Sequence, residues 1–356
     1  MPFNPQRLSI ARKRRLLNQK ALAEKARVEP HTISRCEKGL TTPSDENVKQ
    51  FSRTLGFPKE FFEGPNLEMP GPELVSFRSQ KAMTAAVRDA ALAAGAIGFL
   101  LSDWVEDRFD LPASQIPDLH LYEPETAARA LRQEWGLGER PISNLIHLLE
   151  SKGVRILSLA ENSKRVNAFS LWRAEKPYVF LNTMKSAESS RYDAAHELGH
   201  LALHQDGKTT GRDAEDQANQ FAAAFLMPRA DVLAVIPRVN YLAQMVEAKK
   251  RWRVSVAALN YRLHKLGVTS DWKYRDFCIQ ISEKKYNVAE PFEMERERSV
   301  VWQKVMKSLW AEKTTQRDMA AQLNLPESEV MTLIYGILHS GGEGRPEAGR
   351  PLSLVS

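Results

Sequence analysis

Apolar residues recur at every third or fourth position along much of the chain, the spacing that gathers side chains on one face of a helix. In residues 7–62 these runs are short and stop at Gly39 and Gly56, which predicts a small unit built only from helices. Residues 63–73 contain three prolines and two glycines, so this segment is expected to be a linker. An Ala-rich helix is expected over residues 79–109, either packed internally or serving as a rigid connector.

The pattern changes from about residue 123, where helices give way to short runs of strand character. Helices are expected over 123–136 and 142–152. Three strands are expected after them: 154–159, 167–172 and 178–181. The later apolar periodicity predicts helices over these segments: 189–204, 213–226, 229–236, 240–252, 255–266 and much of 293–340. Helices on both sides of a small group of strands predict an α+β domain.

The expected fold class is therefore mainly α, with an N-terminal all-α domain and an α+β domain that contains the strands. The expected divisions of the chain are an all-α domain at 1–66, a linker and helical connector at 67–120, the α+β domain at 121–270, a C-terminal helical region at 271–340 and a tail at 341–356. The tail is rich in glycine and proline, so we expect it to be disordered.

The charge of the chain is concentrated at its N-terminus. Hydrophobic residues make up 43% and charged residues 26%, as in an ordinary globular protein, which excludes wholesale disorder. The net charge is +6, yet residues 1–60 hold 13 basic and 6 acidic side chains, so the remainder is close to neutral. A local basic excess on a short segment is typical of a module that contacts phosphates, which predicts double-stranded DNA as a partner of this segment.

The cysteines and the apolar runs indicate the compartment. Cys36 and Cys278 lie far apart and form no CxxC pattern, so neither a disulfide framework nor a thiolate metal site is expected. The most apolar run, residues 90–101, has 12 residues, whereas a membrane span needs about 20. We therefore expect a cytoplasmic protein with no membrane segment.

Residues 196–200 read HELGH within an expected helix. Positions four apart lie on the same face of a helix, so His196 and His200 can direct both imidazoles at one metal ion, with Glu197 beside them as a general base. Such a pattern also arises on ordinary amphipathic helices. Here its neighbours are small and apolar, and a buried His-Glu-His set without a metal would leave polar groups in need of partners. The surroundings therefore favour a metal site, and the pattern favours Zn²⁺.

A third ligand is expected downstream, because catalytic zinc sites use three protein ligands. His204 continues the four-residue step, but eight helical residues place it about 12 Å along the axis from His196, so we expect it to act outside the ligand set. Glu215, at the start of the next expected helix, is the preferred third ligand, and Asp213 and Asp216 remain alternatives.

Two further residues are expected to support the ligand side chains without binding the metal themselves. Asn219 lies one turn after Glu215 on the same helix face, so its side chain could hold the N–H of a ligand imidazole. His204 is given the same kind of supporting role, or a purely structural one.

Residues 19–37 read as a helix, a tight turn and a second helix. This geometry lets the N-terminal part of the second helix enter the major groove of DNA. The residues expected to face base edges are His31, Thr32, Ser34 and Arg35, and those expected to contact phosphates are Gln19, Lys20 and Lys38. Any one of them could instead lie on a solvated helix face. Cys36 is expected to pack inside the unit as a small apolar residue.

A second segment, residues 314–334, repeats the order of helix, turn and helix. It carries Glu327 and Glu329 where a DNA reader needs neutral or basic groups. A structural pair of helices is therefore favoured over a second DNA reader.

Several motifs together resemble known families. The run from about 125 to 267, with AARALRQEWGL, NAFS, AAHELGHLALH, ANQFAAAFLMP and WRVSVAALNYRL, resembles the ImmA/IrrE zinc metallopeptidases, and residues 7–62, with TISRCEKGLTTPS, look like an XRE-type helix-turn-helix domain. The resemblance implies a gluzincin-like site with His196, His200 and Glu215 as zinc ligands. It also implies Glu197 as the general base. Gln217 stands where members of the family often carry an acidic residue.

A peptidase site of this kind also needs a donor for the oxyanion, and Tyr241, Tyr261 and His264 are candidates that could equally be packing residues. The peptidases of the family cut repressor proteins in response to stress, which implies a transcriptional regulator that cleaves itself or a partner repressor in a stress or phage-type response. The alternative is a transcription factor or antitoxin-like protein whose peptidase-like domain senses a ligand or a partner without proteolysis. A homodimer on a two-fold DNA site is expected.

Overall fold

The computed structural model describes residues 2–71, 84–159, 168–205, 207 and 209–338. Its N-terminal head consists of short helices around one small core: α1 (Pro5–Arg14), α2 (Gln19–Ala26), α3 (Pro30–Glu37), α4 (Asp45–Leu55) and the 3₁₀ helix η1 (Lys59–Glu63). Asn18 and Ser44 cap α2 and α4 by accepting hydrogen bonds from backbone N–H groups of the first turn. Cys36 is fully buried in this core, as predicted. The all-α N-terminal domain is confirmed.

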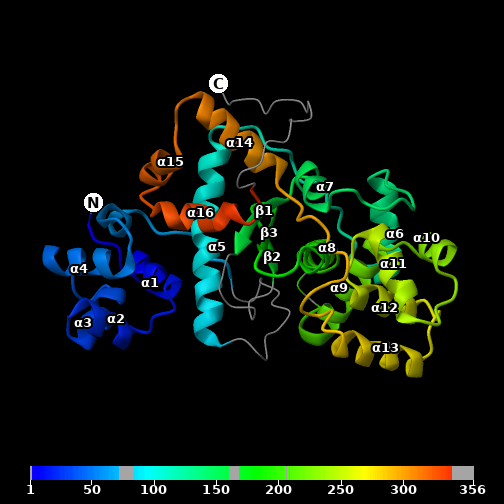
Figure 1. The fold of residues 1–356 in the computed structure, drawn as a ribbon. Coiled ribbons are helices and arrows are strands. Elements are labelled where there is room, and N and C mark those ends of the chain that lie inside the picture. The colour runs from blue at the N-terminus through cyan, green and yellow to red at the C-terminus, as the bar shows by residue number, and fades with distance from the viewer. Residues whose placement is uncertain (1, 72–83, 160–167, 206, 208, 339–356) are drawn as a thin grey trace.

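The long helix α5 (Ala85–Glu106) stands between the head and the rest of the molecule (Figure 1). In the described part of the chain it is the one helix long and apolar enough to cross a membrane. However, 67% of its apolar 18-residue stretch is buried inside the protein. It therefore behaves as a core helix. A Cβ at Gly98 would lie 2.7 Å from the Phe180 ring and 2.9 Å from Leu157, so only glycine lets α5 approach the sheet this closely.

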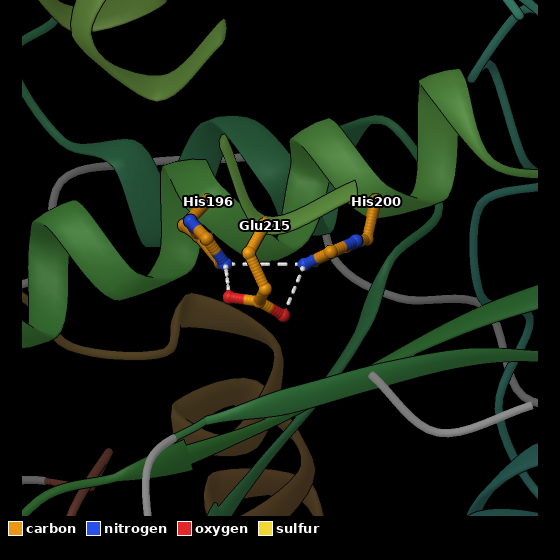
Figure 2. Close-up of side chains that lie close together, drawn as sticks. All are labelled: His196, His200 and Glu215. Atoms are coloured by element: carbon orange, nitrogen blue, oxygen red, sulfur yellow. Dashed lines mark hydrogen bonds and ion pairs between the residues drawn. The ribbon is translucent and has the colours of Figure 1, made fainter. Parts of the chain in front are cut away.

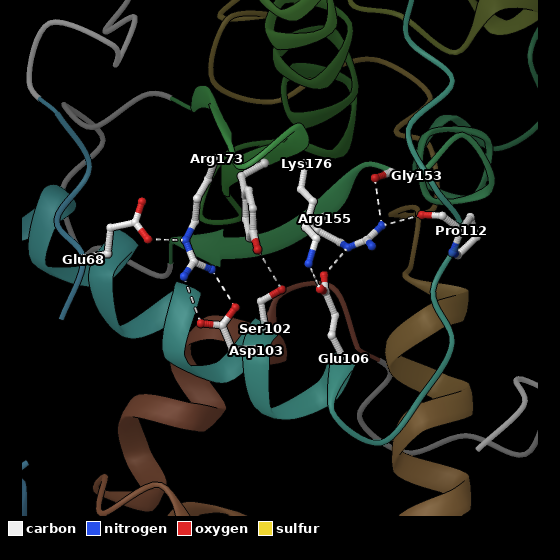
Figure 3. Close-up of polar contacts among 10 residues, drawn as sticks. Glu68, Ser102, Asp103, Glu106, Pro112, Gly153, Arg155, Arg173 and Lys176 are labelled. Carbon is white, nitrogen blue, oxygen red and sulfur yellow. Dashed lines mark hydrogen bonds and ion pairs between the residues drawn. The ribbon is translucent and has the colours of Figure 1, made fainter. Parts of the chain in front are cut away.

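A small mixed sheet lies next to α5: β1 (Arg155–Leu159), β2 (Phe169–Arg173) and β3 (Lys176–Asn182), in the order β1-β3-β2. Strand β3 pairs in parallel with β1 and antiparallel with β2. Ion pairs fasten the sheet to α5 (Figure 3): Arg173 binds Asp103 in a bidentate manner at 2.6 and 3.0 Å, and Arg155 binds Glu106 at 2.7 Å. The predicted strands are confirmed within two residues at each end.

Helices make up the rest of this part of the chain: α6 (Pro124–Glu134), α7 (Leu145–Ser151), α8 (Ala187–Leu203), α9 (Gly211–Leu226), α10 (Arg229–Val235), α11 (Leu242–Trp252), α12 (Val256–Lys265) and α13 (Asp271–Glu283). Helix α8 packs against β2, β3 and α9. Helix α13 was not predicted, because only Phe277 and Ile281 of its apolar side chains are buried and its periodicity is correspondingly weak. The mainly α fold class with an α+β part is confirmed.

The C-terminal region returns to the head through α14 (Val300–Ala311), α15 (Gln316–Gln322) and α16 (Glu327–Tyr335). Residues 293–299 precede α14 without helical structure, although they lie in the segment, from about 293 to 340, that was expected to be helical. The reason is that this segment makes its contacts with distant helices. Glu297 pairs with Arg191 of α8 and accepts a hydrogen bond from the backbone N–H of Leu145 in α7 at 3.0 Å. The predicted disordered tail, 341–356, lies outside the described residues.

Helix α16 connects the head to the sheet, because it packs against β1 and also meets α1 (Figure 1). The Glu329 side chain is 4% exposed and pairs with both Arg14, at 2.8 Å, and Arg15. Val330 and Leu333 of the same helix are buried. These contacts give α16 a structural role in joining the head to the sheet, in line with the structural pair of helices that the sequence favours for residues 314–334.

We expect Glu329→Ala to loosen the docking of the head. It removes the Glu329 carboxylate from two arginine side chains, one of them buried, at a cost of about 3 kcal/mol in the free energy of unfolding. Urea unfolding curves measure the loss. Glu327→Ala on the same helix, where the side chain is exposed, is the control and should change little. Equal losses in the two variants would contradict a specific role for Glu329.

Candidate metal centre and nucleic-acid interface

Helix α8 carries the predicted histidines and is enclosed on almost every side. Its N-terminus is capped by Ser186, whose side chain accepts from the N–H of Ser189. His196 and His200 lie one turn apart, with side chains that are 1% and 7% exposed. The rest of this helix packs against the sheet and α9. The two imidazoles are therefore held in place by a rigid, buried element.

Helix α9 brings Glu215 to the same point. The two helices pack closely, and a Cβ at Gly199 of α8 would lie 3.2 Å from the Ala218 Cα of α9. Glycine at this position allows the close approach. The carboxylate oxygens of Glu215 then lie 3.3 Å from His196 Nε2 and 3.4 Å from His200 Nε2, and the two Nε2 atoms are 3.1 Å apart (Figure 2).

These distances can be tested against the geometry of zinc. Ligand atoms at about 2.0–2.1 Å from a tetrahedral ion lie about 3.3–3.4 Å from one another. The triangle formed by His196, His200 and Glu215 is close to that size, and two imidazoles with one carboxylate are a zinc-type donor set. Asp213 and Asp216, the alternatives to Glu215, have exposed side chains and do not join this group. The residues fit a metal ion.

The charge of Glu215 also suits a ligand. Burial acts to raise the pKa of its carboxyl, but the hydrogen bonds and charges of His196 and His200 outweigh burial and hold that pKa well below its usual range. Glu215 is therefore ionised at neutral pH. An ionised carboxylate between two imidazoles is a ready cation ligand.

Glu197 is buried next to the histidines, and it contacts a residue that the sequence did not single out. The hydroxyl of Ser170, on β2, donates to Glu197 Oε2 at 2.6 Å. Ser170 belongs to the NAFS motif quoted above, but nothing in the sequence shows which helix that strand faces. The bond fixes one oxygen of the Glu197 carboxylate.

His204 lies outside the metal triangle and contacts one of its members. Its Nδ1 is 2.9 Å from His200 Nδ1, and its Nε2 is 2.9 Å from Gln217 Oε1. The contact found at Asn219 is between its backbone carbonyl and the Tyr192 hydroxyl, at 3.0 Å. The supporting role of the Asn219 side chain stays a prediction.

A cavity of about 590 Å³ is lined in part by α8 and α9, the two helices that carry the metal triangle. Tyr192 and Asn219, which line it, lie one turn from His196 and Glu215 on their helices, and Tyr261 of α12 lines it too. Burial and, to a smaller extent, the charge of Asp216 raise the pKa of Tyr261 to about 12, so its hydroxyl keeps its proton. Of the other predicted oxyanion donors, Tyr241 is 72% exposed and His264 stacks on Tyr274.

The predicted DNA-contacting residues lie at the start of α2, along α3 and at the C-terminal end of α3. His31, Arg35 and Lys38 are exposed, as is Lys20 at the start of α2, while Thr32 and Ser34 are half-buried. Arg35 donates to the Thr41 hydroxyl at 2.9 Å. Gln19, predicted to contact a phosphate, donates instead to Glu37 at 2.7 Å within the head. Its side chain therefore has an internal partner that a phosphate contact would have to replace.

Comparisons with known proteins bear on both regions. Residues 8–62 match the family model described as helix-turn-helix. Residues 149–264, which contain the metal triangle, match the model of the IrrE N-terminal-like domain of peptidase family M78. No curated protein matches this sequence.

Proposed function

We propose that this chain, which carries an XRE-type helix-turn-helix DNA-binding domain and an M78 peptidase-like domain, is a transcriptional regulator with zinc-dependent endopeptidase activity. Its substrate is a repressor-like protein, either the chain itself or a partner. The single observation that carries the proposal is the triangle of His196, His200 and Glu215 with Glu197 beside it. A DNA-binding domain implies that the protein works inside the cell, and we propose the cytoplasm.

The residues around the triangle supply the parts that peptide hydrolysis requires. Bound Zn²⁺ supplies Lewis acidity, which polarises a carbonyl and lowers the pKa of water. Glu197 takes a proton from the attacking water and passes it to the leaving amine. Ser170 orients the Glu197 carboxylate. Tyr261, protonated in the adjacent cavity, is the donor that we assign to the oxyanion.

The test is a cleavage assay on the full chain. The zinc-loaded protein is incubated alone and with repressors encoded beside it, with and without duplex DNA, and the products are identified by mass spectrometry. We expect a defined cut that disappears when a chelator removes the metal. Identical products with and without the chelator would contradict a zinc-dependent peptidase.

For the head, we expect binding to duplex DNA that weakens steeply as salt rises, because basic residues at the N-terminus replace condensed cations on the phosphates. Arg35→Ala should relax the sequence preference, at about 1–3 kcal/mol for a lost base contact. Lys20→Ala should weaken binding to all sequences alike. Titrations of labelled duplexes at several salt concentrations measure both effects.

The control for the DNA variants is Arg275→Ala, which removes an exposed charge from α13, far along the chain from the head. It should leave affinity unchanged. If Arg275→Ala weakens binding as much as Lys20→Ala does, the assignment of the DNA surface to the head is wrong. We also propose a homodimer on a two-fold site, which the stoichiometry of the same titrations reports.

A further inference from the structure

A short chain of polar side chains runs outward from the metal triangle. It begins at His200 on α8, passes to His204, the C-cap of that helix, and ends at Gln217 on α9. The two contacts join His200 Nδ1 to His204 Nδ1 and His204 Nε2 to Gln217 Oε1, each at 2.9 Å. The His204 backbone N–H also donates to the His200 carbonyl at 3.1 Å, so the end of the helix fixes the backbone from which the His204 ring extends.

The protons of this chain can be placed by counting donors and acceptors. A neutral imidazole has one N–H and one nitrogen lone pair. His200 Nε2 points at His196 and Glu215, so binding a cation there requires its lone pair. The proton of His200 must then sit on Nδ1 and be donated to His204 Nδ1. His204 Nδ1 consequently accepts, and its own proton lies on Nε2, facing the Gln217 carbonyl oxygen.

We infer that Gln217 acts through His204 as a positioning residue, which holds His200 in the tautomer and orientation that present its Nε2 lone pair to the metal. The inference rests on the zinc site of the proposed function. For this role, position 217 must carry a hydrogen-bond acceptor within reach of His204 Nε2. Glutamate satisfies the requirement, whereas methionine, of similar length, offers only a weak acceptor sulfur.

The expected loss of zinc affinity depends on how many side chains separate Gln217 from the metal. Outer partners of metal-ligating histidines typically contribute about 10- to 100-fold to metal affinity. Gln217 is one step further out than such a partner, and both it and His204 are half-buried, so water partly replaces the lost acceptor. We therefore expect Gln217→Met to weaken zinc binding by about 10-fold, near the lower end of that range.

The experiment measures zinc affinity of the full chain by competition with a chromophoric chelator, so it does not depend on peptidase activity. Gln217→Met should bind zinc about 10-fold more weakly than the wild type. Gln217→Glu should bind at least as tightly as the wild type. Gln220→Met, at another half-buried glutamine of α9, is the matched control and should bind as the wild type does.

The outcomes separate the positioning role from its alternatives. Equal zinc affinity of Gln217→Met and the wild type would overturn the inference and leave the metal site standing. A loss of affinity in Gln220→Met as large as in Gln217→Met would also overturn it, because the effect would then come from general damage to α9. If the wild type itself binds no zinc, both the inference and the proposed function fail. Melting temperatures of the metal-free variants, expected to agree, show that folding is unchanged.

Discussion

Glu197→Gln is expected to abolish most peptide cleavage while leaving zinc in place. The substitution is nearly isosteric and keeps His196, His200 and Glu215, so the metal triangle is undisturbed. The Ser170 hydroxyl can still donate to the amide oxygen of glutamine, which preserves the local packing. What is lost is the proton acceptor. General base catalysis typically contributes roughly 10²- to 10⁴-fold, so the cleavage rate should fall by that factor.

Metal analysis and cleavage kinetics on the same preparation check this result. Asp213→Asn is a matched acid-to-amide control, at an exposed position at the start of α9, and it should keep both metal and activity. A Glu197→Gln protein that contains zinc and cleaves at the wild-type rate would contradict the assigned base.

The same variant separates a peptidase from a sensor in the cell. A regulator that acts by proteolysis should, with Glu197→Gln, still occupy its DNA site but fail to switch transcription. A protein that senses a ligand or a partner needs no proton transfer, so its switching should be normal. Normal switching by a zinc-loaded Glu197→Gln protein would therefore favour the sensor or antitoxin-like alternative over the peptidase.

Glu215→Ala is expected to remove most of the bound zinc. It deletes one corner of a three-residue triangle, and the loss of affinity should exceed the roughly 10- to 100-fold typical of an outer partner. His204→Ala should cost less, because His204 contacts His200 rather than the ion. Zinc content after dialysis, together with competition titrations, ranks the two variants. An essential His204 and a dispensable Glu215 would reverse the assignment of the third ligand.

Local patterns in the sequence were sufficient wherever a single element decides the outcome. The four-residue step between His196 and His200 puts both rings on one face of any helix, whatever surrounds it. The paired helices of the head and the three strands could therefore be predicted, although α13 was missed because it buries few apolar side chains.

The contacts between distant segments were decided only by the tertiary structure. The sequence preferred Glu215 but left Asp213 and Asp216 open as alternatives, and the close crossing of α8 and α9 at Gly199 is what places Glu215 at the histidines. Three further contacts also join separate elements. Ser170 of β2 contacts Glu197 of α8, Gln217 of α9 contacts His204, and Glu329 of α16 contacts Arg14 of α1. Spacing along one helix is determined by its own geometry, but the approach of two elements depends on packing over the whole core, which no local pattern records.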